Sequence, residues 1–319
     1  MNDVLLNNQV IIYLLSEIIL YSLLLVSFLV TPYIIKNWDF NSFTAKQFSL
    51  ENRSYLIITI ISFTIILKIL LLPYFVYTID ELSNIVTGAM CGAGVIKSNS
   101  YGNPLLLLKI VILFLSGFWI SINRLDLKAK NYPYTTIKLW FFIFIFLLLT
   151  LEIYLDILYF MNIESSKPVS CCSIIFEAKN YLPFGLDINK LLILFYLLYF
   201  LILLANISDR YILSISANIL FLPIAYYSVI YFFGTYIYEL PTHKCPFCML
   251  QSSYYFIGYF IWGVLLVGIF KSIDYSLRRV LFKEAVDIDK NISIILLTIF
   301  VLLCSGFVAS YYFKTGVFL

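Results

Sequence analysis

Charged residues are scarce in this sequence. Asp, Glu, Lys and Arg make up 12% of the 319 residues, whereas 62% of the residues are hydrophobic. Soluble domains carry about 25% charged and about 45–50% apolar residues. A chain with so few charges has too little polar surface to face water on all sides. This excludes an ordinary soluble protein and favours lipid as the solvent.

Basic stretches are also missing, and we expect no cleavable leader sequence. No basic face and no basic stretch interleaved with aromatic residues occurs, so we expect no nucleic acid partner. The first residues, MNDVLLNNQ, lack a basic region, and no cleavage site of small residues stands out after them. We therefore expect the first apolar stretch to remain in the protein as a helix.

Long apolar stretches make up most of what is present. A bilayer core is spanned by about 20 mostly apolar residues in a helix. Eight stretches reach this length, near 9–35, 55–79, 104–123, 138–160, 188–206, 212–237, 250–270 and 291–313. The sequence therefore predicts an all-α, polytopic integral membrane protein with about eight transmembrane helices in one bundle. We expect a single transmembrane domain over residues 1–319, in contact with membrane lipid.

Basic residues between the predicted helices are unevenly distributed. Thirteen follow the first, third, fifth and seventh helices: Lys36, Lys46, Arg53, Arg124, Lys128, Lys130, Lys138, Arg210, Lys271, Arg278, Arg279, Lys283 and Lys290. The other loops and the C-terminus hold six: Lys97, Lys167, Lys179, Lys190, Lys244 and Lys314. Because basic loops are retained in the cytoplasm, this bias predicts that both termini are extracytoplasmic.

Five of the six cysteines fall in loops on the predicted outer side, namely Cys91, Cys171, Cys172, Cys245 and Cys248. The predicted inner loops contain none, and Cys304 lies within the eighth helix, where we expect a packing role. We expect the membrane to be the bacterial inner membrane, whose outer face is oxidising. Thiols there form disulfides, bind a soft metal or exchange electrons.

The segment HKCPFCMLQ, His243 to Gln251, contains the sharpest motif. Cys245 and Cys248 form a C-x-x-C at the predicted start of the seventh helix. The unpaired N–H groups of a helix start and the positive charge of His243 and Lys244 would stabilise a thiolate there. The thiolate is the attacking species in disulfide exchange, so the motif predicts a redox-active pair. A plain stabilising disulfide is the simpler alternative.

The run CPFCMLQ resembles the C-P-x-C-x-L-Q run of the bacterial disulfide-bond oxidase family (DsbB). It is equally similar to the C-P-[YFW]-C run of vitamin K epoxide reductase homologues. Residues 90–109 add a second similarity to the reductase homologues through Cys91, Val95, Ser98, Tyr101 and Pro104. Both families are bundles of about four helices, half the number predicted here, that move electrons between thiols and a quinone.

These resemblances imply a membrane thiol–disulfide oxidoreductase. Cys245 and Cys248 would exchange electrons with a membrane carrier, for which quinone is the first candidate. Cys91, Cys171 and Cys172 would pass the disulfide to or from an extracytoplasmic partner such as a thioredoxin-like protein. No cofactor-binding residue is assigned by the resemblance.

Soft-metal handling is the alternative function. Thiolate and imidazole groups of Cys91, Cys171, Cys172, His243, Cys245 and Cys248, joined by the thioethers of Met90 and Met249, would select copper(I). The chain has only four Met and one His, and two of the Met and the His flank these cysteines. No predicted helix carries Met, Cys or His at helical spacing, which argues against a metal path through the bilayer.

Ionisable residues inside predicted helices are a further candidate site, because burying a charge in a membrane is costly. Glu152 and Asp156 are four residues apart and therefore share one helix face. Lys109 lies about one and a half turns into the preceding predicted helix from the same side of the membrane, at a depth that allows an ion pair with one of these carboxylates. Glu17 and Lys68 are further candidates. The group predicts either a proton route through Glu152, Asp156 and Lys109 or a structural ion pair.

Overall fold

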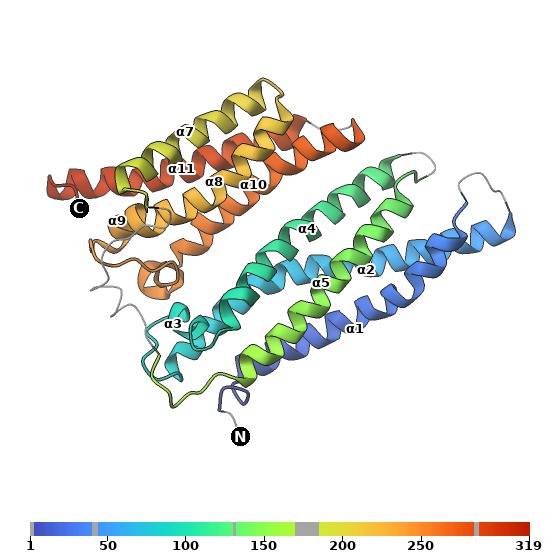
Figure 1. Cartoon of the computed structure of the whole chain (residues 1–319), viewed down its shortest axis with the longest axis horizontal. Coiled ribbons are helices and arrows are strands. Elements are labelled where there is room, and N and C mark those ends of the chain that lie inside the picture. The colour runs from blue at the N-terminus through green and yellow to red at the C-terminus, as the bar shows by residue number, and fades with distance from the viewer. Residues whose placement is uncertain (1–2, 40–43, 130–131, 170–184, 284–286) are drawn as a thin grey trace. The chain divides into compact units, whose positions relative to one another are not determined.

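The computed structural model describes residues 3–39, 44–129, 132–169, 185–283 and 287–319 (Figure 1). Every regular element within these ranges is a helix. Eight helices in the described part of the chain are long and apolar enough to cross a membrane, and many large apolar side chains on them are exposed. The all-α, polytopic membrane fold predicted from composition is therefore confirmed.

The chain divides into two compact units. The first unit comprises Met1–Gly88 and Val95–Val169, and the second comprises Ala89–Gly94 and Ser170–Leu319. Each unit contains four of the eight candidate spans. The division does not test whether residues 1–319 form a single transmembrane domain, so that expectation stays a prediction.

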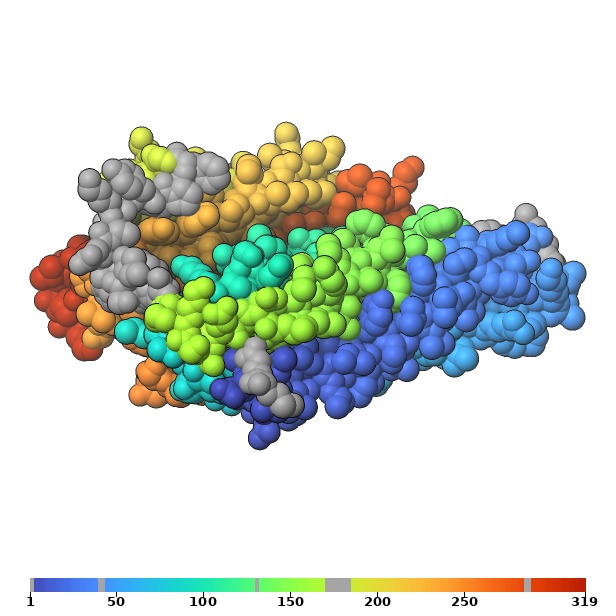
Figure 2. All heavy atoms as spheres, turned by 60° about the horizontal axis from the view of Figure 1, so that its bottom comes forward, coloured from blue at the N-terminus to red at the C-terminus, as the bar shows by residue number. Residues whose placement is uncertain are grey.

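The first unit is built from four long helices: α1 (Asn8–Asn37), α2 (Ala45–Glu81), α4 (Gly102–Lys128) and α5 (Thr135–Met161). α1 and α5 lie side by side along one face of it (Figure 2). Trp119 and Phe142 are fully buried in its apolar core. The Asn7 and Thr44 side chains accept hydrogen bonds from the first turns of α1 and α2, which fixes where these helices begin.

The second unit contains α7 (Ile188–Ile207), α8 (Tyr211–Ser228), α10 (Ile257–Phe282) and α11 (Asp287–Thr315). α8 continues through a π-helical segment, η3 (Val229–Phe233), into α9 (Gly234–Tyr238), and the three together form one span. The rings of Phe195, Phe221, Phe233 and Phe300 pack against one another in the core, with centroids 5.1–6.3 Å apart.

The connection between α2 and α4 contains two short helices, η1 (Leu82–Asn84) and α3 (Gly92–Ile96). Thr87 donates its backbone N–H to Ser165 and accepts one from Val169, which ties this connection to the chain that follows α5. Cys91 lies directly before α3, in the segment that belongs to the second unit.

Two predicted helix starts are wrong. The second helix was expected from residue 55, but α2 begins at Ala45. The seventh helix was expected over 250–270, but α10 begins only at Ile257. The intervening residues form two single 3-10 turns, η4 (Cys248–Leu250) and η5 (Ser252–Tyr254). Tyr255 and Phe256 then adopt φ values of 53° and 55°. These left-handed conformations cannot continue a right-handed helix, so the helix starts after them.

Candidate thiol site

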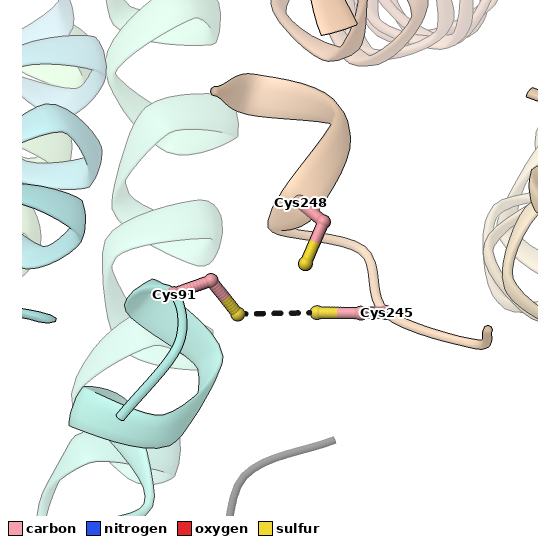
Figure 3. A group of neighbouring side chains, drawn as sticks. All are labelled: Cys91, Cys245 and Cys248. Atoms are coloured by element: carbon pink, nitrogen blue, oxygen red, sulfur yellow. Dashed lines mark hydrogen bonds between the residues drawn. The ribbon is translucent and has the colours of Figure 1, made fainter. Parts of the chain in front are cut away.

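Three cysteine side chains meet in the second unit (Figure 3). The sulfur of Cys91 lies 3.4 Å from that of Cys245, although the two residues are 154 positions apart. The sulfur atoms of Cys91, Cys245 and Cys248 all lie within 4.8 Å of one another. A disulfide bond is about 2.05 Å long, so Cys91 and Cys245 are in contact without being bonded to each other. We call these three residues the thiol cluster.

The thiol cluster is buried. Cys91 is 0% exposed, Cys245 is 1% exposed and Cys248 is 6% exposed. Reagents and protein partners therefore cannot approach the sulfurs directly in this conformation. Cys171 and Cys172, which the sequence also assigned to the site, lie outside the described residues.

Local hydrogen bonds hold Cys91 beside the C-x-x-C segment. The N–H of Gly94 donates to the carbonyl of Cys91 over 3.0 Å, which forms the turn into α3. The side-chain amide of Gln251 donates to the carbonyl of Met90 over 3.3 Å. Gln251 thus links the chain just after Cys248 to the residue just before Cys91.

The C-x-x-C segment itself is shaped by a single tyrosine. Tyr238, the last residue of α9, donates its hydroxyl to the carbonyl of Cys245. The same hydroxyl accepts the N–H of Met249 over 3.0 Å. One side chain therefore spans the segment from the first cysteine to the residue after the second. Tyr238 was not predicted as a site residue, because nothing in its local sequence distinguishes it among 26 tyrosines.

Aromatic rings and one cation surround this segment. The ring of Tyr238 lies 4.2 Å from that of His243 and 4.8 Å from that of Tyr254, between centroids. Burial raises the pKa of Tyr254 above its ordinary value, and a negative charge on Cys248 raises it further. The ammonium of Lys244 lies 5.3 Å from the centroid of the Tyr231 ring. Burial lowers the pKa of Lys244.

The expected source of thiolate stabilisation is only partly retained. Cys248 lies on the 3-10 turn η4, and α10 begins at Ile257, so the motif does not occupy the start of a long helix. The prediction that the dipole of that helix acts on the sulfurs is therefore wrong. A charge effect of His243 and Lys244 on the sulfurs stays a prediction.

The soft-metal ligand set predicted from sequence is only partly gathered. Among the described residues, the three sulfurs of the thiol cluster lie close enough to one another to hold an ion, and His243 is not part of that group. Met249 is fully buried, whereas Met90 is 63% exposed. Cys304 is buried within α11.

The ionisable residues singled out within the helices also come together, in the first unit. The ammonium of Lys109 lies 2.6 Å from a carboxylate oxygen of Glu152 and 2.8 Å from one of Asp156. The expected ion pair therefore exists, and Lys109 contacts both carboxylates. Lys68 pairs with Glu17 at 2.6 Å and with Glu152 at 2.9 Å.

Comparison with known proteins returns no match. No protein-family model matches the chain. No curated protein matches it. No solved structure matches it.

Proposed function

We propose that this integral membrane protein is a thiol–disulfide oxidoreductase that exchanges electrons between extracytoplasmic thiols and a membrane carrier. The observation that supports this proposal is the 3.4 Å contact between the sulfurs of Cys91 and Cys245, with Cys248 beside them. Disulfide exchange requires a thiolate to reach a sulfur of an existing disulfide. Three sulfurs within 4.8 Å of one another allow a disulfide to move from one pair to another with little motion.

The proposed exchange has two balanced steps. Oxidation of the Cys245 and Cys248 thiols to a disulfide releases two electrons and two protons, and a quinone that takes up both becomes a quinol. A thiolate on Cys91 then attacks Cys245, which forms a Cys91–Cys245 disulfide and releases Cys248 as a thiolate. The reverse sequence passes electrons in the opposite direction, and the sequence favours neither.

Burial of the thiol cluster argues for a relay to the outside. A protein partner cannot reach sulfurs that are 0–6% exposed, so another cysteine has to carry the disulfide to the surface. Cys171 and Cys172 are the remaining loop cysteines that can do this. The excess of basic residues in the opposite loops supports an extracytoplasmic position for both termini and all these cysteines, in a bacterial inner membrane. A thioredoxin-like protein is the kind of partner that such a relay serves.

Soft-metal binding is the second candidate, and the same three sulfurs favour it. A metal held by cysteine with bonds of about 2.3 Å and tetrahedral angles brings its sulfur ligands to about 3.8 Å from one another. The three sulfurs lie within 4.8 Å of one another, so small rotations would fit them around copper(I) or zinc. The absence of His243 from this group weakens the candidate relative to the redox function.

The two candidates are separated by one set of variants of the full-length protein in detergent. We expect Cys245→Ser and Cys248→Ser each to abolish reduction of a short-chain quinone by a dithiol. We expect Cys91→Ser to leave the C-x-x-C oxidisable but to prevent transfer of the disulfide. Mass spectrometry of alkylated peptides should detect a Cys91–Cys245 disulfide in partly oxidised wild-type protein. Cys304→Ser is the matched control, because Cys304 is also buried but lies outside the thiol cluster.

Metal analysis of the same samples tests the metal-binding candidate. Stoichiometric copper or zinc in the wild type that is lost in all three cluster variants, together with no quinone reduction, would replace the redox function with metal binding. Full quinone reduction by the cluster variants, together with no bound metal in the wild type, would contradict both candidates.

A further inference from the structure

A buried ionic cluster lies between four helices of the first unit. Its members come from α1, α2, α4 and α5, and we call them the ionic cluster: Tyr13, Glu17, Lys68, Lys109, Glu152 and Asp156. Their side chains are at most 9% exposed. Each of the four helices is a candidate membrane span. The cluster shares no residue with the thiol cluster, so it requires an explanation of its own.

The charges in this cluster do not balance. Three carboxyl groups, those of Glu17, Glu152 and Asp156, face two ammonium groups, those of Lys68 and Lys109. If all five were ionised, the cluster would carry one net negative charge. An uncompensated charge buried away from water is strongly unfavourable, and a group in that position is neutralised instead. One further positive charge is therefore needed.

Counting the hydrogen bonds of the cluster also shows that one proton is missing. The hydroxyl of Tyr13 accepts a hydrogen bond from Lys109 over 2.6 Å. It faces Glu17 Oε1 at 3.0 Å and both carboxylate oxygens of Asp156 at 3.1 Å. A phenol carries one hydrogen, so Tyr13 can donate to only one of these two carboxylates. The other is left one hydrogen short.

A single added proton would correct both deficits. A proton on Asp156 Oδ1 can be donated to the oxygen of Tyr13, which has a second lone pair for it. The hydrogen of Tyr13 is then available to Glu17 Oε1. Asp156 Oδ2 still accepts from Lys109 at 2.8 Å. Tyr159, the neighbouring titratable group on α5, donates its hydroxyl to the carbonyl of Val95 over 3.0 Å and is already engaged.

We infer that the ionic cluster is a proton-binding site that holds one exchangeable proton, shared between Asp156 and Glu17 through Tyr13. The neighbouring cavity supports exchange. The cavity has a volume of about 20 Å³ for a water-sized molecule. Its lining residues include Tyr13, Glu17, Lys68, Lys109 and Glu152. About 10–15 Å³ is enough for one water molecule between polar partners. The cavity therefore has room for the water that would deliver or remove the proton.

A second buried ion pair in the same unit serves as the comparison. Lys138 pairs with Asp126 at 2.6 Å, and Asp126 also accepts hydrogen bonds from the Tyr134 N–H and the Thr135 hydroxyl. One ammonium here meets one carboxylate, so the charges balance. This pair has no need for a proton.

Infrared spectroscopy of the full-length protein in lipid nanodiscs tests the proposal, since only a protonated carboxyl group has a carboxylic acid C=O band. At neutral pH we expect one such band per chain, shifted by exchange into D₂O. Glu17→Gln, Glu152→Gln and Asp156→Asn should each remove the band, because any of them restores charge balance. Lys68→Met should double it, because a second proton is then needed. Asp126→Asn should leave it unchanged.

Two results would contradict a shared proton in the ionic cluster. No carboxylic acid band in the wild type, or a band that persists in all three carboxyl-to-amide variants, would overturn the proposal. Three independent variants are available, so failure of one to fold does not prevent the test. Cys245→Ser should keep the band, which makes the outcome independent of the proposed thiol chemistry.

Discussion

Replacing Tyr238 with Phe tests the arrangement of the C-x-x-C segment most directly. The substitution keeps the ring, and so the contacts with His243 and Tyr254, but removes the hydroxyl. The carbonyl of Cys245 and the N–H of Met249 then lose this hydrogen-bond partner. Both residues are at most 1% exposed, so water cannot replace the hydroxyl without some opening of the segment.

The size of the effect follows from the cost of an unsatisfied buried group, about 1–3 kcal/mol. A total loss of about 2 kcal/mol, which allows for partial relaxation, raises the population of the opened segment about 30-fold, since about 1.4 kcal/mol corresponds to a factor of ten. The sulfurs are buried in the closed form. Their modification rate should therefore increase by the same factor when opening and closing are fast.

Alkylation of the reduced protein by a maleimide, followed residue by residue with mass spectrometry, measures this rate. Tyr199→Phe is the matched control, because Tyr199 donates a hydrogen bond to Thr298 between α7 and α11 of the same unit. We expect faster alkylation of Cys245 and Cys248 in Tyr238→Phe and wild-type rates in the control. Equal rates in wild type and Tyr238→Phe would refute the bridging role of Tyr238.

Two further predictions concern the same segment. A Cβ added at Gly258 would lie 2.5 Å from Met249 Cγ and 3.0 Å from the Met249 carbonyl carbon, so Gly258→Ala should lower the free energy of unfolding by about 1–3 kcal/mol. Gly263→Ala, with no heavy atom within 4 Å of its new Cβ, should leave that free energy unchanged or raise it by up to about 1 kcal/mol. The pKa of Lys244 is lowered from its ordinary value of 10.5. At a pH just below 10.5, the unfolded chain therefore binds a proton at Lys244 that the folded chain lacks. The free energy of unfolding should therefore rise with pH in that range. Lys244→Gln should abolish this rise, whereas the exposed control Lys167→Gln should retain it; equal pH profiles for all three proteins would contradict the reasoning.

The membrane helices were predictable because their cause is local. A stretch of about 20 apolar residues satisfies its own backbone hydrogen bonds in lipid as a helix. The extension of α2 back to Ala45 was not predicted, because residues 45–54 are more polar and the apolar pattern begins later. The cap formed by Thr44 marks the true start. The π-helical segment Val229–Phe233 consists of apolar and aromatic residues, like much of the span around it, and leaves no compositional signal.

The start of α10 was missed for a different reason. Met249, Leu250 and the aromatic residues that follow are apolar enough to extend the helix in sequence. The turns that replace it depend on tertiary contacts, namely the hydroxyl of Tyr238 on Met249 and the packing of Met249 and Leu250 at Gly258. Such contacts join residues that no local pattern relates to one another.

The ionic cluster was partly predictable, because charges in apolar helices are conspicuous. The spacing of Glu152 and Asp156 and the depth of Lys109 predicted an ion pair that the structure contains. Tyr13 was not predicted, although its hydroxyl lies between Asp156 and Glu17. Its importance appears only when donors and acceptors are counted in three dimensions.

The contact between Cys91 and Cys245 was predictable only in part, because the sequence indicates the side of the membrane but not the distance between the sulfurs. In a chain of alternating spans, the loops after the second and the sixth span lie on the same side of the membrane, so the sequence places both cysteines on one side. That parity does not determine a distance, since loops on one side can be separated by the width of the protein. The 3.4 Å contact depends on specific partners, the Gln251 amide on the Met90 carbonyl and the Tyr238 bridge. A C-x-x-C motif therefore predicts the chemistry of its own two sulfurs, whereas the third sulfur, that of Cys91, is identified only by the fold.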